Sequence, residues 1–165
     1  MLLDKDHLAD SLKPPTYTAY LPCRPREQEY LAIVEAFFND SIYVAKHLWR
    51  DNLFLVKYLL DYELKFVDLR KMLEWRMENA HGWQVKPGAY GKGLRKVIEP
   101  DIWSELESTY VGAGIEENWG ALNRTMALFQ KVATEVAESL GYRYQHEQER
   151  RVKAYIQKMR SEERV

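Results

Sequence analysis

The chain has 165 residues, of which 46% are hydrophobic and 13% aromatic, enough material for one packed core. Its 24 lysines and arginines are balanced by 25 aspartates and glutamates, so the basic excess of a dedicated nucleic-acid binder is missing. The single cysteine, Cys23, excludes an internal disulfide and suits the cytoplasm, and no apolar run approaches the roughly 18 residues that span a bilayer. We therefore expect neither a nucleic-acid nor a membrane partner.

Residues 1–25 contain four prolines and predict an extended arm or linker, because each proline disfavours helix at the residue before it. From residue 26 to residue 165 the pattern predicts one all-helical domain. Apolar residues three and four positions apart indicate a first helix that ends at about Arg50. The next apolar stretch, residues 52–80, is long enough to bend or break near Lys65–Asp68, so we expect two helices there.

Residues 81–93 form the one glycine-dense stretch, which predicts either a connector or a site. Pro100 is placed to open a short helix that runs through Trp103 and Leu106 towards Tyr110. Trp75, Trp103 and Trp119 are expected to pack in the core, because aromatic residues at helical spacing usually do.

The clearest periodicity in the chain predicts a core helix that ends at Gly141, a residue suited to a C-cap. Its apolar positions are Trp119, Leu122, Met126, Phe129, Ala133, Val136 and Leu140. A last helix is expected over Glu147–Arg160, lying on the surface. No useful strand alternation occurs, so the predicted fold class is all-α, a bundle of about five to seven helices.

No constellation of residues predicts an independent catalytic or metal centre. The four histidines are dispersed and form no ligand pair. The segment Gly88–Lys92 has two residues between its glycines, where a phosphate-binding P-loop needs four. Asp4 and Asp6 could imitate the metal-binding carboxylates of a nucleotidyltransferase, but no predicted strand fixes their geometry.

Arg76 and His81 match the Arg-x4-His spacing of helical ribonucleases of the HEPN type. In that reading His81 would be the base and Arg76 would stabilise charge on the scissile phosphate. The same two residues are also expected at the solvated end of a helix. A stand-alone HEPN-like module, acting as a ribonuclease or as the partner of a separate nucleotidyltransferase, therefore stays open as the alternative function.

Residues 41–53 resemble the Ser-Thr-Tyr-Val-Ala-Lys-Gly-Leu-Trp-Arg-Asp-Glu-Leu stretch of aminoglycoside 6-adenylyltransferases, the streptomycin adenylyltransferase family. Four further segments resemble the same family in the same order; they are residues 69–75, 87–92, 108–110 and 132–142. Residues 2–6 are similar to the segment that follows the catalytic domain in the family. Asn39 and His47 depart from the family pattern.

The resemblance implies a nucleotidyltransferase substrate-binding, HEPN-like helical domain. In the family an N-terminal catalytic domain transfers AMP from ATP to a streptomycin hydroxyl and holds the Mg²⁺ ion. We expect that catalytic domain to be absent from this chain, and ATP and the aminoglycoside to be partners of the full-length enzyme. The chain alone is expected to be inactive, to bind no cofactor tightly and to contribute to antibiotic resistance only as part of that enzyme.

By the same resemblance, Lys92, Lys96 and Tyr110 are expected to contact the nucleotide. A lysine offers a mobile point charge suited to a leaving pyrophosphate. Asp68 and Glu74 are expected to bind the polycationic drug through ion pairs. These two carboxylates are six residues apart, so on a helix they point about 120° away from each other.

Overall fold

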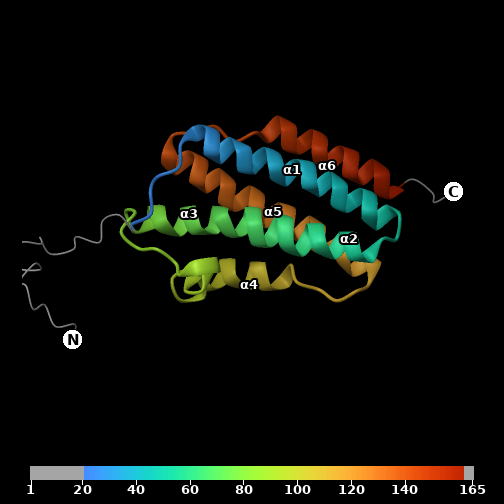
Figure 1. Ribbon diagram of the computed structural model, residues 1–165. Coiled ribbons are helices and arrows are strands. Elements are labelled where there is room, and N and C mark those ends of the chain that lie inside the picture. The colour runs from blue at the N-terminus through green and yellow to red at the C-terminus, as the bar shows by residue number, and fades with distance from the viewer. Residues whose placement is uncertain (1–20, 162–165) are drawn as a thin grey trace, which may run out of the picture.

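The computed structural model describes residues 21–161, which are helical and contain no strand. This confirms the predicted all-α class; the HEPN-like subtype stays a prediction. The longer elements are α1 (Glu27–Trp49), α2 (Leu53–Lys57), η3 (Tyr58–Leu69), α3 (Arg70–Ala80), α4 (Pro100–Ser108), α5 (Ile115–Leu140) and α6 (His146–Ser161). In Figure 1, α1 and α6 lie side by side along one edge of the bundle, and α4 lies at the opposite edge.

Helix α1 buries one apolar stripe against η3, α5 and α6. Tyr30, at the start of the stripe, donates its hydroxyl hydrogen to the Ala133 carbonyl at 2.9 Å. Ser41 is also fully buried and donates to the Phe37 carbonyl one turn back, at 2.7 Å. Both polar groups therefore enter the core with a hydrogen-bond partner, which removes most of the cost of burying them.

The predicted break near Lys65–Asp68 is wrong. The helix runs without interruption from Leu53 to Ala80, and its middle, η3, is a 12-residue π-helical segment. The length of the stretch suggested two helices, but the wider turns of η3 let it continue as one helix. π-helical segments are rare in proteins, and those that occur often lie at functional sites. Leu60, Leu64 and Leu69 face the core from η3, while Tyr58 and Tyr62 stay about half exposed.

Helix α5 lies between the other long helices and contacts α1, α3, α4 and η3. All seven predicted apolar positions, from Trp119 to Leu140, are buried. The helix ends as predicted at Gly141, whose φ of 73° is the left-handed conformation that glycine adopts without strain. Helix α4 begins at Pro100, also as predicted. Trp75 and Trp119 are buried and Trp103 is half-buried.

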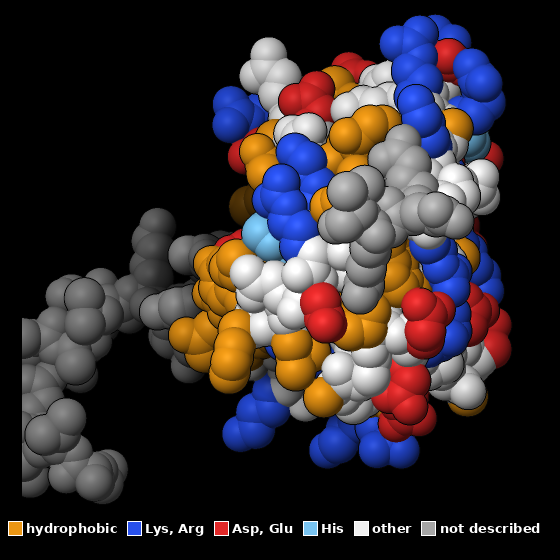
Figure 2. All heavy atoms as spheres, turned by 90° about the vertical axis from the view of Figure 1, so that its right-hand side faces the viewer, with side chains coloured by type: hydrophobic (Ala, Val, Ile, Leu, Met, Phe, Trp, Pro, Cys, Tyr) orange, Lys and Arg blue, Asp and Glu red, His pale blue; other side chains and the backbone are white. Residues whose placement is uncertain are grey.

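One end of the bundle carries exposed hydrophobic groups. Figure 2 shows this end, where α1 passes into α2, and hydrophobic side chains gather on one side of it. The large exposed apolar residues of α2 and the first turn of η3 are Phe54, Leu55 and Tyr58; Phe54 is 90% exposed. None of the described helices is long and apolar enough to cross a membrane.

Phe129 tests the core assignment. Its ring is fully buried and stacks on Phe37 with centroids 3.6 Å apart and an interplanar angle of 4°. We expect Phe129→Ala to lower the free energy of unfolding by about 3–5 kcal/mol, because it removes buried apolar surface and leaves a cavity. Urea denaturation followed by circular dichroism measures the change. A loss below about 1 kcal/mol would show that this face of α5 is not the core.

Candidate functional site

A cavity of about 140 Å³ lies where the glycine-rich loop meets η3 and α4. Tyr90 and Gly91 of the loop form one side of it, and Tyr110 lies just beyond the end of α4. Its apolar lining is Phe66, Leu73, Leu94, Trp103 and Leu106, and its basic lining is Lys65 and Arg70. The cavity thus has an apolar and partly aromatic lining that is suited to a planar ligand, with two basic side chains at its wall.

The chain around Tyr110 is held by side chains from other helices. Lys65 donates to the Thr109 carbonyl at 2.6 Å, and Lys57 donates to the Val111 carbonyl at 3.1 Å. Arg124, from α5, donates to the Ser108 carbonyl at 2.8 Å. The last carbonyls of a helix have no partner within the helix, and cations stabilise them through both hydrogen bonds and the helix dipole.

The carbonyl groups of the two glycines between α4 and α5 are also held by a side chain. The Asn118 amide donates to Gly112 at 3.0 Å and to Gly114 at 2.8 Å. Together with Lys57, Lys65 and Arg124, this amide fixes the turn that carries Tyr110.

Lys65 is a buried cation, with 2% of its surface exposed. Its ammonium group lies 2.7 Å from the Asp61 carboxylate and 4.4 Å from the centroid of the Tyr110 ring. Burial lowers the pKa of Lys65, and the ion pair with Asp61 opposes that effect. Because these partners occupy it, Lys65 positions Tyr110 and is not free to bind a phosphate.

Aromatic rings form a stacked row along the exposed side of η3, and the row ends at the loop. Tyr58 and Tyr62 are 5.7 Å apart between centroids, Tyr62 and Phe66 are 5.5 Å apart, and Phe66 and Tyr90 are 5.9 Å apart. The Arg70 guanidinium lies 4.8 Å from the Phe66 ring. Each such contact stabilises the arrangement by about 0.5–1.5 kcal/mol.

The predicted nucleotide contacts fall in this region. Tyr110 lines the cavity and is 53% exposed. Lys92 follows the loop turn Ala89–Gly91, and Lys96 ends the turn Leu94–Lys96; both lysines are exposed and make no ion pair among residues 21–161. Neither lysine lines the cavity itself. The two lysines therefore lie on the glycine-rich loop and the turn that follows it, whereas Tyr110 lies on the connection after α4, beside the same cavity.

The two predicted drug-binding carboxylates have different neighbours. Glu74 is 7% exposed and forms an ion pair with Arg70 at 2.5 Å, with Lys71 at 3.8 Å. A side chain at Gly91 would meet Arg70 at 3.3 Å and Glu74 at 3.8 Å, so this pair lies directly under the loop. Glu74 is therefore already neutralised within the domain.

Asp68 instead belongs to an acidic cluster, defined here as Asp40 of α1 with Glu63 and Asp68 of η3. Asp68 is 4% exposed, and its Oδ2 atom has no hydrogen-bond partner among the described residues. Burial, and then the charges of Asp40 and Glu63, raise the pKa of Asp68 to about 7. Burial and Glu63 also raise the pKa of Asp40. A cationic group that reached this cluster would offset the repulsion among its carboxylates and so lower the pKa values of both Asp68 and Asp40.

Sequence patterns did not single out Lys65, Arg70, Tyr90, Asp40 or Glu63. Asp40 and Glu63 lie on different helices, so their proximity to Asp68 depends on how α1 packs against η3. The aromatic residues at 58, 62 and 66 did carry a signal, because a repeat of four places side chains on one side of a helix. The positive φ of Tyr90 carried none, since glycine is the usual residue there.

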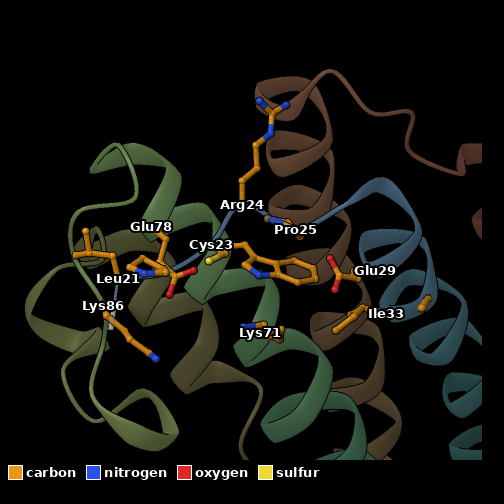
Figure 3. A pocket seen from close by; sticks show the side chains of 12 residues that line it. Leu21, Cys23, Arg24, Pro25, Glu29, Ile33, Lys71, Glu78 and Lys86 are labelled. Atoms are coloured by element: carbon orange, nitrogen blue, oxygen red, sulfur yellow. The ribbon is translucent and has the colours of Figure 1, made fainter. Parts of the chain in front are cut away.

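A larger hollow, of about 580 Å³, lies between residues 21–25, the start of α1 and α3 (Figure 3). Trp75 lines it, with the Lys71 ammonium 5.2 Å from its ring. Its charged lining is Arg24, Glu29, Lys71, Glu78 and Lys86. Positive and negative groups are mixed there, and none of the predicted site residues lines it, so it is a weaker candidate for either substrate.

The ribonuclease alternative gains no support from the geometry. The Arg76 guanidinium is bound by the carboxylates of Glu99 and Glu135. His81 is exposed, and its Nδ1 atom lies 2.9 Å from the Met77 carbonyl. An arginine already paired with two carboxylates is a poor partner for a scissile phosphate. Asp4 and Asp6 lie outside the described residues, and residues 21–161 contain no group of three possible metal ligands.

The model of the streptomycin adenylyltransferase family matches residues 1–159. The chain belongs to this family. It is 32% identical over 145 residues to an aminoglycoside 6-adenylyltransferase of Bacillus subtilis and 30% identical over 145 residues to one of Campylobacter jejuni. Each match covers 87% of this chain but 50% of the relative, so the chain spans about half the length of these relatives.

The fold agrees with that assignment. A crystal structure of an aminoglycoside 6-adenyltransferase from Bacillus subtilis superposes with a TM-score of 0.77 at 24% identity. The match covers 92% of this chain and 57% of that one. The helical bundle is therefore the fold that this part of the relative adopts.

The raised pKa of Asp68 predicts how stability depends on pH. The pKa of Asp68 is about 7 in the folded chain, whereas in the unfolded chain it is near 3.8, the usual value for an aspartate. The stabilising contribution of protonated Asp68 is therefore complete below about pH 4 and is lost as the pH rises through about 7. We expect Asp68→Asn to raise the free energy of unfolding, relative to wild type, by about 1–3 kcal/mol at pH 8 and by little at pH 4.

Urea titrations at pH 4, 6 and 8 measure this difference. Asp101→Asn is the matched control, because the Asp101 side chain is 70% exposed. A difference between Asp68→Asn and wild type that does not change with pH would contradict the assignment.

Proposed function

We propose that this chain is the helical half of an aminoglycoside O-adenylyltransferase, and that it contacts both the nucleotide and the drug. Family membership supports the reaction class, transfer of AMP from ATP to an aminoglycoside hydroxyl. The observation that carries the proposal is the turn around Tyr110, which side chains of three other elements hold beside the glycine-rich loop that bears Lys92. In this proposal Tyr110 contacts the nucleotide. Lys92 neutralises charge on the departing pyrophosphate, and Lys96 assists it.

The drug end of the proposed site is the acidic cluster. Aminoglycosides are polycations, so a buried carboxylate with a free oxygen is a strong partner for a guanidinium or ammonium group. Asp68 has such an oxygen, whereas Glu74 is already paired with Arg70. We therefore assign the ground-state ion pair to Asp68 and a supporting role beneath the loop to Glu74.

Catalysis of AMP transfer also needs a divalent metal that carboxylates hold on the phosphates. Residues 21–161 provide no such ligand set, so the metal would be held outside the described helices. ATP and Mg²⁺ are cofactors of the whole enzyme, with the metal on its N-terminal catalytic domain. The compartment we propose is the cytoplasm, where ATP is available.

The proposal predicts a division of labour. Given ATP, magnesium and streptomycin, the 165-residue chain should release no pyrophosphate above background, because its residues 21–161 offer no group of metal ligands. In a full-length enzyme that carries this chain as its helical half, Lys92→Ala should lower kcat by about 10²-fold or more, since the lost charge faces the leaving group. Asp68→Ala should chiefly raise the KM for the drug, because it removes a ground-state ion pair.

A coupled pyrophosphate assay measures both changes, and Lys158→Ala on α6 is the matched control for a lost exposed lysine. Adenylylation by the bare chain would overturn the division of labour. RNA cleavage by the chain that His81→Ala abolishes would replace this proposal with the ribonuclease function.

A further inference from the structure

Tyr90 adopts a backbone conformation that its side chain disfavours. Its φ of 59° and ψ of 30° are left-handed. Glycine adopts this region freely, whereas a bulky residue with a Cβ atom is strained there. The Tyr90 ring is 78% exposed, so its own burial does not offset the strain. A strained and exposed aromatic residue points to a role outside folding.

The neighbouring structure fixes where this ring lies. Gly91, with a φ of 71°, brings the loop so close to Arg70 that an added Cβ atom would lie 3.3 Å from the Arg70 side chain. The ring of Tyr90 then stacks on Phe66 with centroids 5.9 Å apart and an interplanar angle of 27°. One face of Tyr90 is supported by Phe66, and the rest of the ring remains open beside the 140 Å³ cavity.

We propose that Tyr90 stacks on the purine base of the nucleotide at the mouth of this cavity. This inference rests on the proposed function and names the residue that recognises the base. A nucleobase has apolar faces and polar edges, which suits a supported aromatic ring above a lining of Leu73, Leu94 and Leu106. Lys92 lies two residues after Tyr90. When Tyr90 holds the base, the phosphates of the same nucleotide can therefore be met by Lys92 of the same loop.

The test compares ATP with inorganic tripolyphosphate, which has the phosphates but no base. Isothermal titration calorimetry on the 165-residue chain measures both affinities, and thermal unfolding measures stability. In Tyr90→Gly the relief of backbone strain offsets the loss of the Phe66 contact, so Tm should stay within about 2–4 °C of wild type. ATP should nevertheless bind about tenfold more weakly, since one stacked base is lost, while tripolyphosphate should bind as in wild type.

Two further variants complete the design. Tyr90→Trp should keep the ATP affinity, because an indole also stacks. Tyr155→Ala, which removes an exposed tyrosine of α6, should change neither affinity. Equal ATP affinity in wild type and Tyr90→Gly would overturn this inference alone. A lower Tm with weaker binding of both ligands would show that the ring is structural and would also overturn it. Binding of neither ligand by wild type would overturn the inference together with the proposed function.

Discussion

The unpaired carbonyl groups at the end of α4 are the constraint on which the candidate site depends. Helix α4 has nine residues, too few to be stable without partners. Cations from α2, η3 and α5 satisfy its last carbonyls and those of the following turn, with Asn118 completing the set. Lys65 is the central member, because a buried ammonium must keep its partners to remain charged. The position of Tyr110 follows from this network.

The π-helical segment η3 joins the two ends of the proposed site. Lys65 faces α4 and the cavity, whereas Asp68 faces the acidic cluster with Asp40 of α1. The exposed side of the same segment carries the stacked aromatic row that ends at Tyr90. One helix therefore presents cations, aromatic rings and carboxylates on three sides. Under the proposed function, the aromatic row would lie at the nucleotide end of the site and the acidic cluster at the drug end.

Much of the fold could be predicted from the sequence, because the long helices bury regular stripes. The apolar positions of α5 and its end at Gly141 follow directly from spacing and from glycine chemistry. The region around Lys65 and Asp68 could not be predicted in this way. An apolar stretch of this length fits a break between two helices as well as one helix with a π-helical middle, and only packing against α1 and α5 decides between them.

The candidate site was predictable only in part. Family resemblance selected Lys92, Tyr110 and Asp68, and the fold places Tyr110 at the cavity that the loop before Lys92 also lines. The partners that position them are contacts between residues far apart in the chain, such as Lys65 with Thr109, and spacing along one helix says nothing about those. The resemblance also grouped Glu74 with Asp68, but their neighbours differ, because Glu74 meets Arg70 under the loop.

The central claim is that the loop beside Tyr110 is the nucleotide-contacting surface of this domain. Titration of the ¹⁵N-labelled chain with ATP, followed by amide chemical shifts, tests it most directly. The account predicts that the largest shifts fall in residues 88–96 and 108–112, with smaller changes at Phe66 and Arg70. Shifts concentrated instead in residues 21–33 and at Lys71, Glu78 and Lys86, the lining of the larger hollow, would contradict it.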